Sequence, residues 1–321
     1  MNDSFKRNFI VTVVHRIKET LMRFRYYKFS LFRKNKQQFY ISIFDEKRTG
    51  FGLADRFKGM ISLYAFCKIK NIPFRNTFTY PFDFLQFIEP NKYDWRLKDG
   101  ERSSYSSDVR VLIVQGEDSP WRLTWLKTKK QTHTYINRDY LPIFNRKYGT
   151  LFDWGELFHE LFKPAPKLEM EINRHLSIIH SSYIACQLRF MALLGDFKEY
   201  NNLPLHEKEQ QVLINQCTGI ILDLKKQCEK PILVVSDSII FLQHISQFEG
   251  IITFPDKTVH IDCVGNEDDS VYMKPFIDFL LLSKADKIYN IVVGEMYPSE
   301  FPLYAAKINN IPFERINKTT V

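Results

Sequence analysis

Residues 275–308 read as a helix, a short apolar strand and a second helix, and this unit limits the folds open to the chain. The first helix ends in a run of leucines, the strand covers residues 287–293, and small residues open the second helix near Ala305. Asp278 lies in the first helix, and Ser299 lies in the loop after the strand. Helix N-termini offer free N–H groups and a favourable field for phosphate. The unit therefore predicts an α/β fold with a place for a nucleotide.

The rest of the chain, from residue 38 on, repeats this alternation. We expect strands at residues 39–44, 74–80, 109–114, 182–188, 232–235, 250–254 and 312–316, and helices at residues 55–70, 155–162, 205–228 and 239–248. Apart from the short helix, residues 121–167 give no clear pattern. Strands that alternate with helices of about ten or more residues predict parallel sheets built from βαβ units.

The length of the chain predicts two domains, because 321 residues are too many for one ordinary domain. A hydrophobic content of 45% supports a large core. The sequence has no run of about 18 apolar residues, and its start lacks the apolar stretch and cleavage site of a signal peptide. We expect an arm at residues 1–37, an N-terminal Rossmann-like domain on the acceptor side at 38–175, and a C-terminal Rossmann-like nucleotide-sugar domain at 176–321.

A short internal repeat supports two related halves. Lys68–Phe74 and Lys307–Phe313 are identical at six of seven positions, and each follows a predicted helix. The asparagine suits a left-handed residue at the helix end, the proline stops the helix, and the phenylalanine begins a strand. We therefore expect two Rossmann-like domains that face each other across a cleft.

The net charge of +8 is concentrated in the first 36 residues, which hold ten Lys or Arg against Asp3 and Glu19. The other 285 residues are neutral, with 35 basic and 35 acidic groups. Apolar side chains recur in this arm at the spacing of an amphipathic helix: Ile10, Val13, Val14, Ile17, Leu21 and Phe24. Such a helix suits an anionic membrane surface, or it packs on the body with a solvated basic face, and both alternatives stay open. A neutral body disfavours nucleic acid as the partner.

The five cysteines predict neither a disulfide framework nor a zinc site, because their number is odd and no two have the C-x-x-C spacing. A reducing, cytoplasmic compartment fits this usage. The histidines show no ligand spacing, and the acidic cluster at residues 267–269 reads as a solvated loop. We therefore expect no metal and no cofactor.

Three predicted strands end in residues that suit an anionic ligand. Gly50 and Gly52 separate a strand from a helix, where α/β proteins present backbone N–H groups to ligands. Arg189 ends a buried strand, and its bidentate fork suits a diphosphate, although pairing with a carboxylate such as Asp196 explains it equally well. Asp237 ends another strand, where capping the next helix is a sufficient explanation.

These segments resemble the fucosyltransferase superfamily that includes core α1,6-fucosyltransferases and protein O-fucosyltransferases. The run DFLLLSKAD from Asp278, the Ser-Glu-Phe loop at 299–301, the G-x-G loop at 50–52 and the sequence QLR at 187–189 carry the resemblance. It extends over residues 42–66, 182–198 and 231–309. Gln187 stands where the family has a histidine, and residues 294–298 are additional before Ser299.

The resemblance implies a GT-B glycosyltransferase that transfers fucose from GDP-fucose to a glycan hydroxyl, with inversion and without a metal. It implies that Arg189 stabilises the departing β-phosphate, with Asp196 or Asp55 as the base. A role in capping or salt-bridging a helix explains Asp278 from the residues alone. The resemblance implies that Asp278 accepts hydrogen bonds from guanine. The residues implied at the donor are Gly50, Gly52, Gln187, Arg189, Asp237, Asp278, Ser299, Glu300 and Phe301.

The expected partners are a nucleotide-sugar donor, a glycan acceptor and, if the arm binds lipid, the inner face of a membrane. A non-catalytic nucleotide-sugar or glycan-binding protein on the same scaffold is the alternative, with Gln187 marking lost chemistry. Fucose itself is expected from the resemblance alone, because the residues do not distinguish one donor sugar from another.

Overall fold

The computed structural model describes residues 3–48, 51–115, 120–124, 129–196, 203–255 and 269–319. The chain divides into two compact units. Unit 1 holds Met1–Phe84 and Glu89–Lys163, and unit 2 holds Leu85–Ile88 and Pro164–Val321. The boundary predicted after residue 175 falls inside helix α6 (Pro166–Ile179), which belongs to unit 2. In the described part of the chain, no helix is long and apolar enough to cross a membrane.

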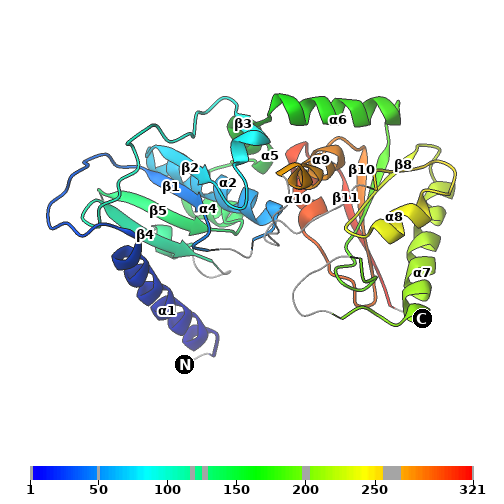
Figure 1. The fold of residues 1–321 in the computed structure, drawn as a ribbon, viewed down its shortest axis with the longest axis horizontal. Helices are drawn as coiled ribbons and strands as arrows, with labels where there is room; N and C mark the ends of the chain where they lie inside the picture. Colours follow the sequence, from blue (N-terminus) through cyan, green and yellow to red (C-terminus); the bar gives the residue numbers. More distant parts are fainter. Residues whose placement is uncertain are drawn as a thin grey trace. The chain divides into compact units, whose positions relative to one another are not determined.

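Unit 1 contains a four-stranded sheet in the order β2-β1-β5-β4, and every pair of neighbours is parallel (Figure 1). Its strands are β1 (Tyr40–Phe44), β2 (Phe74–Phe78), β4 (Val109–Val114) and β5 (Gln131–Ile136). Its helices are α1 (Asp3–Tyr26), α2 (Leu53–Lys70), α3 (Trp121–Thr124), α4 (Leu141–Tyr148) and α5 (Trp154–Leu161). The 3-10 turn η1 (Phe84–Gln86) and the paired strands β3 (Ile88–Pro90) and β6 (Phe162–Pro164) lie where the division falls.

Unit 2 contains a five-stranded parallel sheet in the order β11-β10-β7-β8-β9. Its strands are β7 (Ile184–Leu188), β8 (Ile232–Ser236), β9 (Ile251–Thr253), β10 (Lys287–Val293) and β11 (Phe313–Lys318). Besides α6, its helices are α7 (Glu207–Lys226), α8 (Ile239–Ile245), the 3-10 turn η2 (Asp269–Tyr272), α9 (Met273–Leu282) and α10 (Phe301–Ile308). Helices α7 and α8 cover one face of the sheet, and α9 and α10 cover the other (Figure 1). The predicted mixed α/β fold with parallel sheets is confirmed.

The central strands of unit 2 are buried on both faces, which explains their nearly unbroken apolar sequences. All five residues of β7 and all five of β8 are buried. Side chains of β7 and β8 pack with those of α7 and α8 in one hydrophobic cluster, which includes Cys186, Val234 and Cys217. The chain builds β7, β8 and β9 in one direction and then returns to β10 on the other side of β7, so the direction of winding reverses there.

The internal repeat marks the same structural event in both units. Asn71 and Asn310 adopt left-handed conformations with φ of 51° and 52°. The next residue in each segment donates its N–H back into the helix, from Ile72 to the Cys67 carbonyl at 3.0 Å and from Ile311 to the Ala306 carbonyl at 2.9 Å. A phenylalanine then begins β2 or β11, each an edge strand of its sheet. The predicted helix ends are therefore confirmed.

Strand β5 is a central element of the unit 1 sheet that the sequence did not predict, and helix α4 was not predicted either. It pairs with both β1 and β4, yet its sequence QTHTYI is mostly polar, and all six residues are buried. Two of its polar side chains find partners inside the unit: Gln131 Nε2 donates to the Glu101 carbonyl at 2.8 Å, and His133 Nδ1 lies 2.6 Å from the Tyr27 hydroxyl. Burial of polar groups is tolerated here because these side chains are hydrogen-bonded.

Helix α1 folds as part of unit 1, and a buried ion pair holds it. The Arg122 Nη2 atom lies 2.7 Å from Glu19 Oε1, and the same oxygen accepts the Ile113 N–H at 2.7 Å. Glu19 is only 5% exposed. One turn further along, Arg23 Nε donates to the Ser106 carbonyl at 2.9 Å. These contacts attach α1 to the end of β4 and to the loop before it.

A close approach between α2 and the end of β5 requires a glycine. A Cβ atom placed on Gly59 would lie 2.1 Å from the Ile136 carbonyl oxygen, a backbone atom that cannot move aside by rotation. The contact therefore fixes how deeply α2 packs against the sheet.

We predict opposite effects for two Gly→Ala substitutions in helices. Gly59→Ala should lower the free energy of unfolding by about 3 kcal/mol, because the helix must move away from β5. Gly219→Ala should raise it by about 0.5–1 kcal/mol, because a Cβ there meets nothing within 4 Å in the described structure and alanine favours the helix. Urea unfolding of both variants measures this difference, and similar effects would contradict the close approach.

Candidate functional site

The carboxyl edge of the unit 2 sheet gathers most of the predicted donor residues. In open parallel sheets, ligands bind outside the carboxyl ends of the strands where the direction of winding reverses, which here is between β7 and β10. Arg189 follows β7 directly, Asp237 follows β8, and Ser299 lies in the segment between β10 and α10. The strand ends therefore bring these three residues to one edge of the sheet.

The turn that carries Arg189 is held by the Asp237 carboxylate. Oδ1 of Asp237 accepts the Phe190 N–H at 2.8 Å, and Oδ2 accepts the Met191 N–H at 2.9 Å. Met191 has a φ of 55°, a left-handed conformation that a residue with a side chain rarely adopts without support. The two hydrogen bonds supply that support, so Asp237 positions the backbone on which the Arg189 side chain is mounted.

Burial raises the pKa of Asp237 to about 6, against an ordinary value of 3.8. The positive charge of Arg189 and the N–H donors of Phe190 and Met191 act in the opposite direction, and burial outweighs them. This environment is typical of a functional site, where charged groups are kept out of water close to their partners.

The additional residues before Ser299 fold back onto Arg189. The Tyr297 N–H donates to the Arg189 carbonyl at 3.3 Å, and the Arg189 guanidinium lies 5.6 Å from the centre of the Tyr297 ring. The Ser299 N–H then donates to the Tyr297 carbonyl at 2.8 Å. The segment that sets this chain apart from the family pattern therefore contacts its predicted phosphate-binding residue.

A chain of polar side chains connects Gln187 to the Ser299 loop. Asn290 Nδ2 donates to Gln187 Oε1 at 2.8 Å, and Arg315 Nε donates to Asn290 Oδ1 at 2.7 Å. Arg315 Nη2 also donates to the Ser299 carbonyl at 2.8 Å. Gln187 Nε2 donates to the Leu188 carbonyl at 3.2 Å. Gln187 therefore helps to support the Ser299 loop. The chain of hydrogen bonds runs across β7, β10 and β11.

Asp278 lies in the interior of α9 as half of a buried ion pair. Lys274 Nζ is 2.5 Å from Oδ1 and 2.6 Å from Oδ2 of the carboxylate, and both residues are about 95% buried. A guanine at this carboxylate would have to take over hydrogen bonds that Lys274 makes here. Lys274 precedes Asp278 by one helical turn, the spacing at which oppositely charged side chains pair along a helix.

The Ser-Glu-Phe loop begins α10 at Phe301, four residues earlier than the small residues suggested. Ser299 is 4% exposed, and its Oγ accepts the Phe301 N–H at 3.2 Å. The Phe301 ring packs 5.0 Å from the ring of Phe279 on α9. Glu300 is the exposed residue that precedes the helix. The side chains of Ser299 and Phe301 therefore stabilise the turn at the start of α10.

Asp196, the first candidate for the base, caps a helix. Its Oδ2 accepts the Ser238 hydroxyl at 2.8 Å and the Ile240 N–H at 2.9 Å, at the start of α8. A carboxylate at a helix start is stabilised by the free N–H groups there. This structural role accounts for Asp196.

In unit 1, Gly50 lies outside the described residues, and Gly52 precedes the first residue of α2. A Cβ on Gly52 would meet only the Asp55 carboxylate, at 3.9 Å, so packing within unit 1 does not require glycine there. Asp55 pairs with Lys58 at 2.6 Å. Arg56 is buried, and it donates to the carbonyls of Phe51 and Tyr80, which holds the loop before α2.

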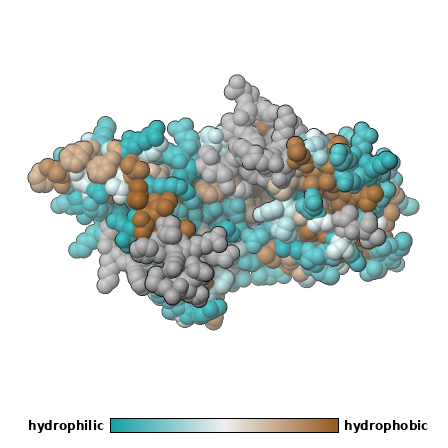
Figure 2. Space-filling model, turned by 90° about the horizontal axis from the view of Figure 1, so that it is seen from below, coloured by the Kyte–Doolittle hydropathy of each residue, from teal (hydrophilic) through white to brown (hydrophobic). Residues whose placement is uncertain are grey.

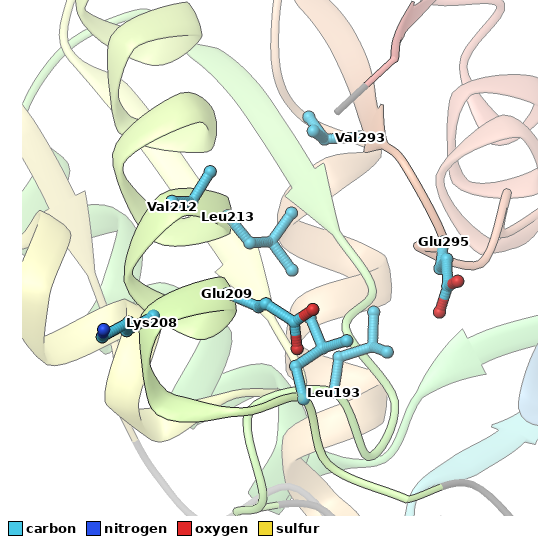
Figure 3. A pocket seen from close by; sticks show the side chains of 8 residues that line it. Leu193, Lys208, Glu209, Val212, Leu213, Val293 and Glu295 are labelled. Atoms are coloured by element: carbon cyan, nitrogen blue, oxygen red, sulfur yellow. The ribbon is translucent and has the colours of Figure 1, made fainter. Parts of the chain in front are cut away.

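A pocket of about 410 Å³ lies beside this edge of unit 2, between α7 and the end of β10 (Figure 3). Its lining is Leu193, Leu205, Val212, Leu213 and Val293, with Lys208, Glu209 and Glu295 as the charged members. Glu209 and Glu295 extend from opposite walls in Figure 3. Two carboxylates against one ammonium disfavour a diphosphate, whereas an apolar wall with hydrogen-bond acceptors suits an uncharged ring with hydroxyl groups. The lining residues read as ordinary core in the sequence, which is why the pocket was missed.

Among the described residues, no group of three or more His, Cys, Asp or Glu side chains is placed to hold a metal ion. The four cysteines in the described ranges are all free, and Cys67, Cys186 and Cys217 are buried. Burial raises the pKa of each of these three thiols.

No protein-family model matches the chain, and no curated protein matches it significantly. Among solved structures, it is similar to the fucosyltransferase NodZ from Bradyrhizobium, with 14% identity and a TM-score of 0.54 over 84% of this chain and 92% of that one. It is also similar to a variant of Arabidopsis thaliana FUT1 in complex with GDP, with 13% identity and a TM-score of 0.57 over 88% of this chain and 70% of that one. At these identities the likeness establishes a shared fold.

We predict that Asp237 makes stability depend on pH. Its folded pKa lies above its ordinary value, so between about pH 4 and pH 6 the native protein holds a proton that the unfolded chain has lost. The contribution of this group to the free energy of unfolding therefore falls as pH rises through that window. Chemical unfolding of the wild type and Asp237→Asn from pH 4 to pH 7 measures it. A difference between the two proteins that stays constant with pH would contradict the raised pKa.

Proposed function

We propose that this chain is a GT-B glycosyltransferase that transfers fucose from GDP-fucose to a glycan hydroxyl. The observation that carries the proposal is the placement of Arg189 where the winding of the unit 2 sheet reverses, on a turn held by Asp237. The fold supports it, since NodZ structures of similar fold contain GDP or were soaked with GDP-fucose.

In the proposed reaction, the acceptor oxygen attacks the anomeric carbon of fucose while the bond to the β-phosphate oxygen breaks. GDP leaves with the electron pair of that bond, and the acceptor hydroxyl loses its proton to water. Arg189 donates two N–H groups to the diphosphate and balances the negative charge that grows on it. The Tyr297 ring beside the guanidinium keeps water from one side of the arginine. Attack from the side opposite the leaving group inverts the anomeric configuration. The arginine and backbone N–H groups supply the positive field, and the proposed reaction uses no metal.

The other donor contacts follow from the same edge of the sheet. The segment from Ser299 to Phe301, where α10 starts, contacts the diphosphate or the ribose, as the resemblance implies. Asp278 recognises guanine by accepting hydrogen bonds from the base in place of those that it accepts from Lys274. Asp196 and Asp55 already have partners, at the start of α8 and at Lys58, so the proposal does not depend on either as the base.

A non-catalytic nucleotide-sugar or glycan-binding protein remains the alternative. Gln187 favours it only weakly, because this residue is occupied in supporting the Ser299 loop through Asn290 and Arg315. Release of free fucose from GDP-fucose by the purified protein distinguishes the two, since a binding protein leaves the donor intact.

We predict that GDP and GDP-fucose raise the melting temperature of the wild type and that Arg189→Ala removes the effect. Loss of one bidentate contact to a diphosphate should weaken binding by about 10- to 100-fold. Differential scanning fluorimetry with a panel of nucleotides and nucleotide sugars measures this. Arg174→Ala is the matched control, because Arg174 is an exposed arginine of α6 in the same unit.

The outcome of the panel separates the parts of the proposal. Stabilisation by a UDP sugar alone would keep a nucleotide-sugar site and overturn the assignment of fucose. The absence of any nucleotide response would overturn the donor site and favour a binding protein for glycans.

We further propose that α1 and the segment after it contact the anionic inner face of a membrane. An apolar stripe on α1 is exposed, with Ile17 at 55%, Leu21 at 62% and Phe24 at 67%. Figure 2 views the protein from the side toward which α1 extends in Figure 1, and hydrophobic side chains are visible there among hydrophilic ones. Arg16 and Arg25 flank the stripe in the sequence. An apolar face bordered by basic residues is the arrangement of a helix that lies on a membrane.

We predict that the wild type co-floats with vesicles that contain phosphatidylglycerol and that replacing Ile17, Leu21 and Phe24 together by serine abolishes this. The expected loss is about 100-fold in partition, at about 1 kcal/mol for each apolar side chain that enters the lipid interface. Leu151→Ser is the control, because Leu151 is 95% exposed elsewhere in unit 1. A wild-type protein that does not float with the vesicles would contradict the membrane contact and would leave the proposed donor site unaffected.

A further inference from the structure

A hollow of about 300 Å³ lies between α1 and β4 in unit 1, and its rim is strongly basic. Its lining is Arg16, Glu19, Thr20, Arg23, Arg110 and Val111. Arg16, Thr20 and Arg23 lie on one side of α1, three and four residues apart, and Arg110 projects from the edge strand β4. The hollow therefore brings three guanidinium groups from two elements to one place.

The single carboxylate of the hollow does not neutralise these arginines. Glu19 Oε1 is occupied by Arg122 at 2.7 Å and by the Ile113 N–H, and Glu19 is buried. Within the described ranges, no carboxylate lies at ion-pair distance from Arg16 or Arg110. Glu19 also acts on Arg110 electrostatically, but one carboxylate faces three arginines of the lining and Arg122, so an anion that entered the hollow would meet an excess of positive charge.

The neighbouring groups also experience this positive field. Burial, and after it Arg23 and Arg33, lowers the pKa of Lys130. Burial likewise lowers the pKa of Arg122, and Arg16 and Arg110 act in the same direction. Cations that lower one another's pKa repel one another, so their proximity lowers the stability of the fold. A bound anion would reduce this repulsion.

The position of the hollow indicates where the anion comes from. Ile17 and Phe24 each follow an arginine of the hollow by one residue, which places the apolar stripe about 100° further around the helix. A lipid whose acyl chains meet the stripe would bring its headgroup to the level of the hollow. Guanidinium groups bind both phosphate and carboxylate in a bidentate manner. A phosphate monoester has three terminal oxygens where a carboxylate has two, so it can contact more of the three guanidinium groups at once.

We propose that the hollow between α1 and β4 is a binding site for the phosphate group of an anionic membrane lipid, held by Arg16, Arg23 and Arg110. This inference rests on the membrane contact proposed above and is independent of the donor site. It adds selection for phosphate to an attachment that would otherwise depend on charge and apolar area alone.

The test compares two kinds of vesicle made from a neutral galactolipid that contains no phosphate. One kind contains phosphatidic acid and the other contains oleate, at contents that give the same zeta potential. We expect the full-length wild type to bind the phosphatidic acid vesicles about tenfold more tightly, which is the effect of one bidentate arginine–phosphate contact. Arg110→Gln should lose this preference, and so should Arg110→Lys, which keeps the charge but not the planar fork.

Arg110 is suited to this test because it is exposed on an edge strand, away from the apolar stripe. Arg146→Gln is the control, since it removes an exposed arginine from α4 in the same unit and should keep the preference. Equal wild-type binding to both vesicles, or a preference retained by Arg110→Lys, would overturn the phosphate site and leave the membrane contact standing.

Two further outcomes bear on the source of the phosphate. A wild type that binds neither kind of vesicle would overturn the membrane contact and the lipid assignment together. Release of the protein from phosphatidic acid vesicles by low concentrations of inorganic phosphate, with no release by chloride of equal ionic strength, would assign the hollow to a soluble phosphate and overturn the lipid.

Discussion

The carboxylate of Asp237 is the group on which the arrangement of unit 2 depends. It ends β8, yet both of its oxygens accept N–H groups from the turn after β7, so it joins the carboxyl ends of two neighbouring strands. The turn would otherwise have to hold Met191 in a left-handed conformation without compensation. Because Arg189 precedes this turn and Tyr297 returns to its carbonyl, the path of the β10–α10 segment depends on the same carboxylate. Burial keeps water away from the Asp237 carboxylate and raises its pKa.

Much of the unit 2 architecture could be predicted from the sequence, because its signals are local. The strands β7, β8 and β10 are short apolar runs followed by polar residues, and buried parallel strands require little else. The repeated segment that ends in Phe74 and in Phe313 was informative for the same reason, since asparagine and proline determine a helix end within a few residues. The residues at the strand ends, Arg189 and Asp237, were also recognised from their position after a strand. The fold shared with fucosyltransferase structures agrees with the parallel sheets that these signals predict.

The features that could not be predicted depend on contacts between distant parts of the chain. Strand β5 is polar in sequence and buried in the structure, because Tyr27 and Glu101 supply partners that no local pattern announces. The sequence left open whether the first helix packs on the body, because the ion pair that attaches it joins Glu19 to Arg122, more than a hundred residues later. An ion pair was one of the roles that its place in a helix left open to Asp278, and the spacing of one helical turn identifies Lys274 as its partner.

The chain of hydrogen bonds from Arg315 to Gln187 has a direction, and this restricts the chemistry of position 187. Arginine only donates, so Asn290 must accept with its oxygen and donate with its nitrogen, and Gln187 must offer an oxygen to it. The other end of the Gln187 amide donates to the Leu188 carbonyl. A neutral imidazole in a single tautomer satisfies the same pair of demands, whereas an imidazolium, with a proton on both nitrogens, would face the Asn290 N–H donor. The hydrogen bonds under the loop are therefore incompatible with a positively charged imidazolium at position 187. The amide of Gln187 does not titrate, so it keeps these hydrogen bonds at every pH.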